Sequence, residues 1–338
     1  MYLIIVNYNN WKDTIECIES LINNEYKEFN ILLVDNCSSD DSVQQIIKYL
    51  KGELFPEIKN TLGRNNIRKR TERISHLIIE EENNKNINDN DKSESAFLAH
   101  PLLFFKSKKN LGFAGGNNIA LRYVLHLYTE GRVAERTKVF FINPDTFVDF
   151  AALNELNKIS DDYFVGACQI RSYNQPDAPG HIGACKLVKL LGKVNTIKSD
   201  NETIDYIYGG ALLTNVATLK KNGLLPEQYF LYWEEFDWCY NAKQKGIPFF
   251  ICKDAIVYDK VGGSTGRGKL AHYYYIRNGL FFYNSYFKKF MLGLFIVDIL
   301  RICVLAALFK FKKANGAFLG VMDFIRGKSG YRPFINNG

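Results

Sequence analysis

An apolar run of strand-forming residues ends abruptly in a polar turn at Val139-Phe140-Phe141-Ile142-Asn143-Pro144-Asp145-Thr146, and this is the most informative feature of the sequence. In an open α/β sheet, ligands bind outside the carboxyl ends of the strands, so Asp145 is expected to face a crevice. A single carboxylate there suits Mg²⁺ or Mn²⁺, since hard cations take oxygen ligands and leave positions for substrate phosphates and water. The alternative is a plain Pro-Asp turn without a ligand.

Three other segments follow the same plan. Residues 2–9 form an apolar run that enters a polar turn, and residues 31–34 lead into the polar cluster 35–40. Residues 110–118 are rich in Gly and Asn and precede the helix-like segment 119–128. Each segment is expected to bring polar groups to the same edge of one sheet.

Seven motifs occur in a fixed order along the chain. They are IIVNYNN (4–10), LLVDNCSSD (32–40), NLGFAGGNN (110–118), FFINPDT (140–146), Gly209-Gly210, FLYWEEFDWC (230–239) and Arg277-Asn278. Together they resemble glycosyltransferase family 2, the inverting nucleotide-sugar transferases of GT-A fold that include bacterial rhamnosyltransferases. The resemblance covers residues 1–282. It implies an α/β fold, a Rossmann-like mixed sheet flanked by helices, and hexosyl or deoxyhexosyl transfer in surface polysaccharide biosynthesis.

Composition agrees with a folded enzyme. The chain has 338 residues, of which 47% are hydrophobic and 14% aromatic, and this excludes a disordered protein. Its seven cysteines are odd in number and contain no CxxC pair, so neither a disulfide framework nor a zinc site is expected. A reducing cytosol fits this pattern. The first residues enter a strand directly, which argues against a signal peptide.

Periodicity outlines the elements. Apolar residues recur at helical spacing over 15–22 and again over 43–50, where Gly52 follows as a helix stop. Strands are expected at 102–105, 164–170 and 249–252, and the alternation of strands and helices favours a mainly parallel sheet. Residues 51–95 interrupt the pattern with a basic run (64–73) and an Asn/Asp/Glu/Lys-rich run (80–95). We interpret this insertion as an enlarged polar surface loop, either tolerated or partner-binding.

The resemblance assigns roles at the nucleotide end of the site. Asp35 would accept a hydrogen bond from a pyrimidine ring, and Asn7 belongs to the same nucleotide-sugar-binding set. Asn117 or Asn118 would lie along the nucleotide, with helix N-capping as the alternative. Asn143 would contact the ribose. Asp145 matches the metal-binding aspartate, and the implied cofactor is a divalent metal ion, Mg²⁺ or Mn²⁺.

A second acidic cluster, Trp233-Glu234-Glu235-Phe236-Asp237-Trp238, supplies the candidate base. Relatives usually carry Glu-Asp in the first two acidic positions, and Glu235 inherits the role of general base although it is a Glu. The assignment among Glu234, Glu235 and Asp237 stays open. Crowding of three carboxylates should raise the pKa of at least one of them. The alternative is an acidic first turn of a helix that runs to Gly246, which the helix dipole favours.

Four further residues complete the candidate set. Asp259 stands where relatives often place a metal-binding His, so it is a candidate second ligand or a turn residue before Gly262-Gly263. Gly209 and Gly210 would let the backbone approach the sugar or acceptor closely, and the alternative is a plain turn. His272 would touch the diphosphate unless it is a packing residue.

The C-terminal region 283–338 is predicted to be a basic, amphipathic helical appendage. Residues 277–332 contain ten basic and two acidic residues, a net charge of +8 against +7 for the whole chain. Residues 290–309 are strongly apolar but interrupted by Asp298 and Arg301, and lysines flank both ends. An interfacial helix pair on an anionic membrane is therefore favoured over a spanning helix. The alternative is a helix packed on the domain.

These observations predict a metal-dependent inverting glycosyltransferase at the cytoplasmic face of the cell membrane. Its expected partners are a nucleoside-diphosphate sugar and a glycan or lipid-linked glycan acceptor, with no nucleic acid. A sugar nucleotidyltransferase is one competitor, but the Asn7-Tyr8-Asn9-Asn10 turn lacks a glycine- and basic-rich phosphate loop. A non-catalytic nucleotide-sugar-binding scaffold at the membrane is the other competitor, and the unusual Glu235 and Asp259 keep it open.

Overall fold

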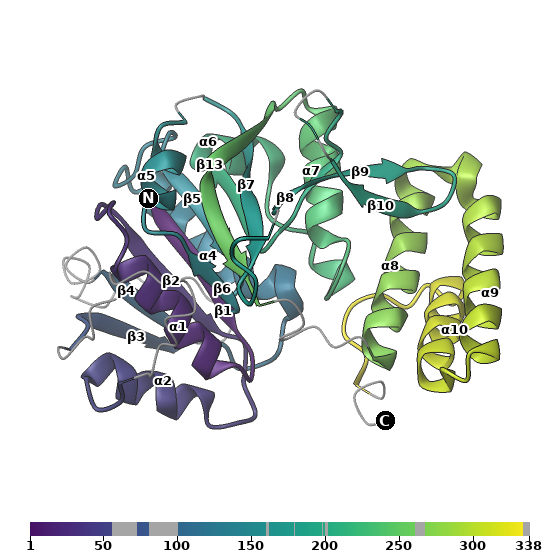
Figure 1. Cartoon of the computed structure of the whole chain (residues 1–338), viewed down its shortest axis with the longest axis horizontal. Helices are drawn as coiled ribbons and strands as arrows, with labels where there is room; N and C mark the ends of the chain where they lie inside the picture. The colour runs from purple at the N-terminus through teal and green to yellow at the C-terminus, as the bar shows by residue number, and fades with distance from the viewer. Residues whose placement is uncertain are drawn as a thin grey trace.

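The computed structural model describes residues 1–55, 73–80, 101–159, 162–178, 180–197, 199, 202–260 and 268–333. A ten-stranded mixed sheet forms its centre (Figure 1). The strands run in the order β3 (His76–Glu80), β4 (Leu102–Lys106), β2 (Asn30–Asp35), β1 (Tyr2–Asn7), β5 (Lys138–Ile142), β12 (Ala211–Asn215), β7 (Val165–Ser172), β13 (Phe249–Asp259) and β6 (Thr146–Val148), and β8 (His181–Ile182) pairs with β7.

The five strands from β3 to β5 are mutually parallel. Asn7, the last residue of β1, therefore stands directly opposite Asp35, the last residue of β2. On the other side of β1, Ile5 pairs with Ile142, so the Asn143 turn begins at the same edge. The expectation that these motifs share one sheet edge is confirmed.

Helices cover both faces of the sheet because its strands are apolar on both sides. One core contains apolar residues of α1 (Trp11–Ile22), α2 (Ser42–Lys51) and α5 (Ala152–Asn157). The other contains those of α4 (Gly112–Thr129), α6 (Val216–Asn222) and α7 (Glu234–Gln244). The α/β class is thus confirmed, and the helix stop at Gly52 is real, since Gly52 takes a left-handed φ of 77°.

Two boundaries differ from those expected. Helix α4 begins at Gly112 and not near Ile119, because its glycines allow the helix to pack against the sheet: a Cβ on Gly116 would lie 2.7 Å from Val6 Cγ1. Strand β3 falls within the 51–95 insertion and pairs with β4, so the loop interpretation is wrong for residues 76–80. The rest of the basic and polar runs, at 56–72 and 81–95, lies outside the described residues.

A second, three-stranded sheet projects from the first. It has the order β10 (Lys193–Thr196), β9 (Ala184–Val188) and β11 (Tyr206–Ile207). Figure 1 shows the β9–β10 hairpin reaching across from the main sheet to the ends of two C-terminal helices, α8 (Lys269–Tyr286) and α9 (Met291–Ala307).

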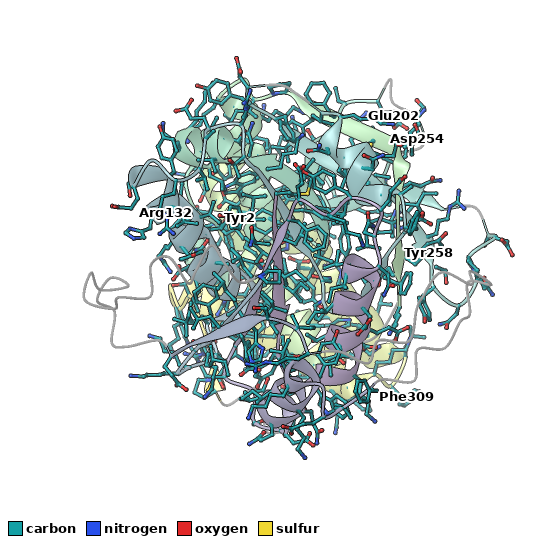
Figure 2. The ribbon with its side chains drawn as sticks, turned by 90° about the vertical axis from the view of Figure 1, so that its left-hand side faces the viewer. Tyr2, Arg132, Glu202, Asp254, Tyr258 and Phe309 are labelled. Atoms are coloured by element: carbon teal, nitrogen blue, oxygen red, sulfur yellow. The ribbon has the colours of Figure 1, made fainter. Side chains whose placement is uncertain are left out.

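The C-terminal region is helical, as expected. After α8 come η2 (Lys288–Phe290), α9 and α10 (Phe311–Ile325). Helix α10 lies against α8 through small residues, since a Cβ on Gly316 would be 2.2 Å from the carbonyl oxygen of Lys269. The expected boundary between residues 282 and 283 falls inside α8, so the catalytic and C-terminal parts share a helix. In Figure 2, Tyr2 lies within the body of the molecule and Phe309, which follows α9, lies at its lower margin.

Candidate active site

The ends of β1 and β2 are joined by a buried hydrogen-bond network. Asn7 donates from Nδ2 to Asp35 Oδ1 at 2.7 Å, and Thr14 on α1 donates from its hydroxyl to Asn7 Oδ1 at 2.8 Å. Ser38 donates to both oxygens of Asp35, from its hydroxyl at 2.6 Å and its backbone N–H at 3.0 Å. Ser38 had no assigned role in the sequence, although it lies within the LLVDNCSSD motif.

The two asparagines of α4 are inside the helix and do not cap it. The helix has Leu111 as its N-cap and no side-chain capping bond, so the capping alternative is wrong. Asn117 donates to the carbonyl of Phe113 one turn earlier. Asn118 donates to the carbonyl of Leu225 and to Glu227 Oε1, both at 2.8 Å. Asn118 therefore ties α4 to η1 (Glu227–Tyr229) and to the segment just before it.

Asp145 combines burial with an unpaired oxygen. Its side chain is 6% exposed, and its Oδ1 is buried without a hydrogen-bond partner. Burial, followed by the negative charge of Asp259, raises the pKa of Asp145 to about 6. Asp259 reaches the same place because its backbone pairs with Thr146, next to Asp145. A cation between the two carboxylates would relieve both the repulsion and the unpaired oxygen.

The pair of aspartates fits a divalent metal of the kind expected. Within the described ranges no group of three or more His, Cys, Asp and Glu side chains is assembled for a metal. Mg²⁺ and related ions are commonly held by one or two protein carboxylates, with substrate phosphates and waters in the remaining positions. Two carboxylates at a strand edge are therefore sufficient protein ligands for a metal that arrives with a diphosphate.

Tyr208 connects the metal-binding candidates to the ribose-binding candidate, and the sequence had not singled it out. Its hydroxyl accepts a hydrogen bond from Asn143 Nδ2 at 3.1 Å and donates to the carboxylate of Asp259. Burial first, and then the charges of Asp259, Asp145 and Glu235, raise the pKa of Tyr208. The hydroxyl therefore stays protonated near neutral pH and can hold Asp259 in place.

Gly209 and Gly210 make room for these side chains. A Cβ on Gly209 would lie 3.0 Å from Glu235 Cγ, and one on Gly210 would lie 2.6 Å from Asn143 Nδ2. The pair thus lets two candidate site residues pack directly on the backbone between β11 and β12. A close approach to the sugar or acceptor stays a prediction.

The three acidic residues of α7 have different surroundings. Asp237 accepts hydrogen bonds from the hydroxyls of Tyr229 and Tyr286, each at 2.6 Å, so both of its oxygens are engaged. Glu234 is 2% exposed and has an unpaired Oε2, and burial followed by the charge of Glu235 raises its pKa well above the usual value.

Glu235 is the one of the three whose side chain packs against Gly209. Its Oε1 accepts from the hydroxyl of Tyr206 at 3.2 Å, whereas its Oε2 has no partner. Burial raises the pKa of Glu235. A carboxylate with one oriented oxygen, one uncommitted oxygen and a raised pKa has the properties of a general base.

The backbone before α7 is strained, and the Arg277-Asn278 motif holds it. Tyr232 and Trp233 both have positive φ, 64° and 76°, which non-glycine residues rarely adopt. Asn278 donates from Nδ2 to three carbonyls of this segment, at distances of 2.7, 2.7 and 3.0 Å, and Arg277 donates to one of them. The motif thus positions the turn that presents Glu235.

His272 lies in the first turn of α8 (Lys269–Tyr286). Its Nδ1 is 3.1 Å from the carbonyl oxygen of Gly268. Burial lowers its pKa, and the nearby positive charges of Lys313 and Arg301 act in the same direction. These neighbours belong to the helical region, and the contact with a diphosphate stays a prediction. Gly262 and Gly263, which follow Asp259, lie outside the described residues.

The sequence is similar to those of known glycosyltransferases. A family model described as glycosyl transferase family 2 matches residues 2–71. The low-salt glycan biosynthesis hexosyltransferase Agl10 of Haloferax volcanii is 26% identical over 200 residues. The match covers 55% of this chain and 61% of that protein, so it spans less than two thirds of the curated relative.

Solved structures show the same fold at low sequence identity. S. aureus TarS 1–349 in complex with UDP-GlcNAc has a TM-score of 0.53 and 17% identity, covering 97% of this chain and 81% of that one. The mannosyltransferase PcManGT from Pyrobaculum calidifontis, in complex with GDP-Man and Mn²⁺, has a TM-score of 0.53 and 10% identity, with coverages of 97% and 87%. At these identities the likeness establishes the fold alone.

Proposed function

We propose that this chain, which belongs to glycosyltransferase family 2, transfers a sugar from a nucleoside-diphosphate sugar to a glycan hydroxyl with inversion, in a reaction that depends on Mg²⁺ or Mn²⁺. The product would be a surface polysaccharide or a related glycan. The observation that carries the proposal is the buried Asp145, with its unpaired oxygen, beside Asp259. Such a pair is costly to bury without a cation.

The nucleotide would bind along the ends of β1, β2 and β5. Asp35 is held ready by Asn7 and Ser38 to accept a hydrogen bond from the base, and Asn143 lies where the ribose would pass. Asn117 would face the nucleotide from α4, whereas Asn118 would act by fixing α4 through Leu225. A bound divalent cation would supply positive charge to the departing diphosphate. Asp145 and Asp259 would hold it, with Tyr208 orienting Asp259.

The acceptor would be activated by Glu235. Its Oε2 would take the proton of the attacking hydroxyl while Tyr206 keeps Oε1 in position. Asp237 is a poor candidate because two tyrosine hydroxyls occupy its oxygens. The negative charge of Glu234 would repel that of Glu235, and this repulsion would favour a proton bound to one of the two carboxyl groups.

The acceptor would be presented from the inner face of the cell membrane. The described residues contain one helical segment, Lys288–Ala307, that is long and apolar enough to cross a bilayer. Several of its apolar side chains are exposed, for example Leu292 at 74%. An interfacial position suits it better than a span, because the ion pair Asp298–Arg301 interrupts it and α8 and α10 pack beside it. A lipid-linked glycan would then meet the site from the bilayer.

The proposal is tested by incubating the chain with a panel of nucleotide sugars and an acceptor, with and without Mn²⁺. Release of nucleoside diphosphate that requires Mn²⁺ supports glycosyl transfer. Release of pyrophosphate with a sugar phosphate and a nucleoside triphosphate as substrates would instead indicate a nucleotidyltransferase. Donor binding without product would indicate a scaffold. Donors are first selected by thermal stabilisation, because a ligand of the native protein raises its apparent stability.

A further inference from the structure

The tip of the β9–β10 hairpin exposes two consecutive leucines. Leu190 is 61% exposed and Leu191 is 46% exposed. Hairpin tips ordinarily carry Gly, Asn, Asp or other polar residues, and here a glycine follows the leucines at position 192 with a φ of 59°. Large apolar side chains at the tip of a projecting hairpin stay in contact with water, which is unfavourable, unless another surface covers them.

The tip is held in a defined position beside the start of α9. Tyr283 of α8 donates from its hydroxyl to the carbonyl oxygen of Lys189 at 2.7 Å. The backbone at Gly192 is so close to α9 that a Cβ there would lie 2.4 Å from Leu294 Cδ1. Gly293 provides a matching close approach, with a Cβ position 3.8 Å from Leu190 Cδ1. The leucines are therefore fixed next to the helix.

Together the tip and the outer side of α9 form one exposed surface, which we call the apolar face. It consists of Leu190, Leu191, Leu292, Ile296, Ile299, Leu300 and Val304. The helical members recur at intervals of three, four and eight residues, as expected for one side of a helix. Lysines lie at both ends of this helix: Lys288, Lys289, Lys310, Lys312 and Lys313.

We propose that the β9–β10 tip inserts Leu190 and Leu191 into an anionic lipid bilayer beside α9, as a second membrane contact that rests on the proposed membrane location. Lysines at the border of an apolar surface bind anionic head groups while the apolar side chains enter the acyl region. A second copy of the chain is a poorer occupant, because a symmetric interface would bring the lysine groups of both copies together.

The hairpin also relates the bilayer to the candidate site. Strand β9 pairs with β11, with Cys185 opposite Tyr206, and β11 continues into Tyr208 and Gly209. Leu190 is five residues beyond Cys185, three in β9 and two in the turn, so the two residues are at most about 17 Å apart at the usual rise of a strand. Tyr206, which donates to the candidate base Glu235, would therefore stand no more than about 20 Å from the apolar level of the membrane, within reach of a sugar on a lipid diphosphate.

The test measures how the full chain partitions onto vesicles of phosphatidylcholine with phosphatidylglycerol. The double variant Leu190→Ser/Leu191→Ser should lower the partition coefficient by at least about tenfold, because two side chains lose apolar burial. The control is Phe150→Ser. Phe150 is 41% exposed and precedes α5, which Figure 1 shows on the opposite side of the molecule from α9. It should change partitioning less than twofold.

Insertion is measured directly with the variant Leu191→Trp and vesicles whose lipids carry bromine on their acyl chains. Bromine quenches the fluorescence of a tryptophan that enters the acyl region. The fluorescence of Leu191→Trp should therefore be quenched more strongly than that of the wild type, which has only the native tryptophans. Absent quenching, or a double variant that partitions like the wild type, would overturn the insertion of the tip. A wild-type chain that binds no vesicles would overturn the membrane location itself, while leaving nucleotide-sugar turnover in solution unaffected. Self-association abolished by the double variant would show instead that a second copy covers the apolar face.

Discussion

Replacing Glu235 with glutamine is expected to remove most of the turnover and to leave the fold and donor binding intact. The amide keeps an oxygen that can accept from the hydroxyl of Tyr206, and the Oε2 that it replaces has no protein partner. It also removes a buried charge whose burial raises the pKa of Glu235, together with the repulsion from Glu234. The melting temperature should therefore stay the same or rise.

The loss of turnover follows from the missing proton acceptor. General base catalysis contributes about 10²- to 10⁴-fold, which corresponds to about 2.7–5.4 kcal/mol in the activation free energy. Steady-state kinetics should show this loss in kcat, while donor affinity, measured separately by calorimetry, stays within about twofold.

The dependence of kcat on pH gives a second test of the role of Glu235. A base must be deprotonated to act, and burial raises the pKa of Glu235 above its usual value. The wild-type kcat should thus fall as the pH drops through this raised pKa. The fall should occur at a higher pH than it would for an exposed glutamate, whose pKa is about 4.3. The residual activity of Glu235→Gln should lack this acid limb.

Asp237→Asn is the matched control. The amide nitrogen cannot accept a hydrogen bond, so one of the hydroxyls of Tyr229 and Tyr286 loses its acceptor, and unfolding free energy should fall by about 1–3 kcal/mol. Its kcat should change little. The reasoning is refuted if Glu235→Gln keeps turnover within tenfold of the wild type, or if Asp237→Asn loses kcat without losing stability.

Three other changes test the rest of the site. Asp145→Asn should abolish Mn²⁺-dependent donor binding in calorimetry, and in the wild type this binding should weaken as the pH falls through about 6, since the proton then competes with the metal; unchanged binding would remove Asp145 from the ligand set. Tyr208→Phe should weaken Mn²⁺ binding about tenfold by electron paramagnetic resonance, because Asp259 loses its orienting hydrogen bond, and an unaltered affinity would contradict that role. Asn278→Ala should lower the unfolding free energy in denaturant by about 2 kcal/mol, since the carbonyls of Leu231 and Tyr232 lose their donor while that of Tyr229 keeps Arg277; a loss below about 1 kcal/mol would show that the strained turn holds itself.

Local patterns were sufficient to predict most elements and the edge on which the site lies. The apolar runs before Asn7, Asp35 and Asn143 predicted three strands, and a parallel arrangement necessarily brings their carboxyl ends together. The helix stop at Gly52 was equally readable. In such cases the signal lies in adjacent residues, which share one periodicity and one turn.

The residue types that line that edge can be read from the sequence, whereas their hydrogen-bond partners depend on tertiary packing. Nothing local to Tyr208 indicates that its hydroxyl meets Asn143, 65 residues away, or that Asp237 is occupied by two tyrosines while Glu235 keeps a free oxygen. The start of α4 at Gly112 likewise depends on packing against β1. The physical reason is that periodicity reports which side of an element is buried, but hydrogen-bond partners and pKa shifts depend on side chains that folding brings together from distant parts of the chain.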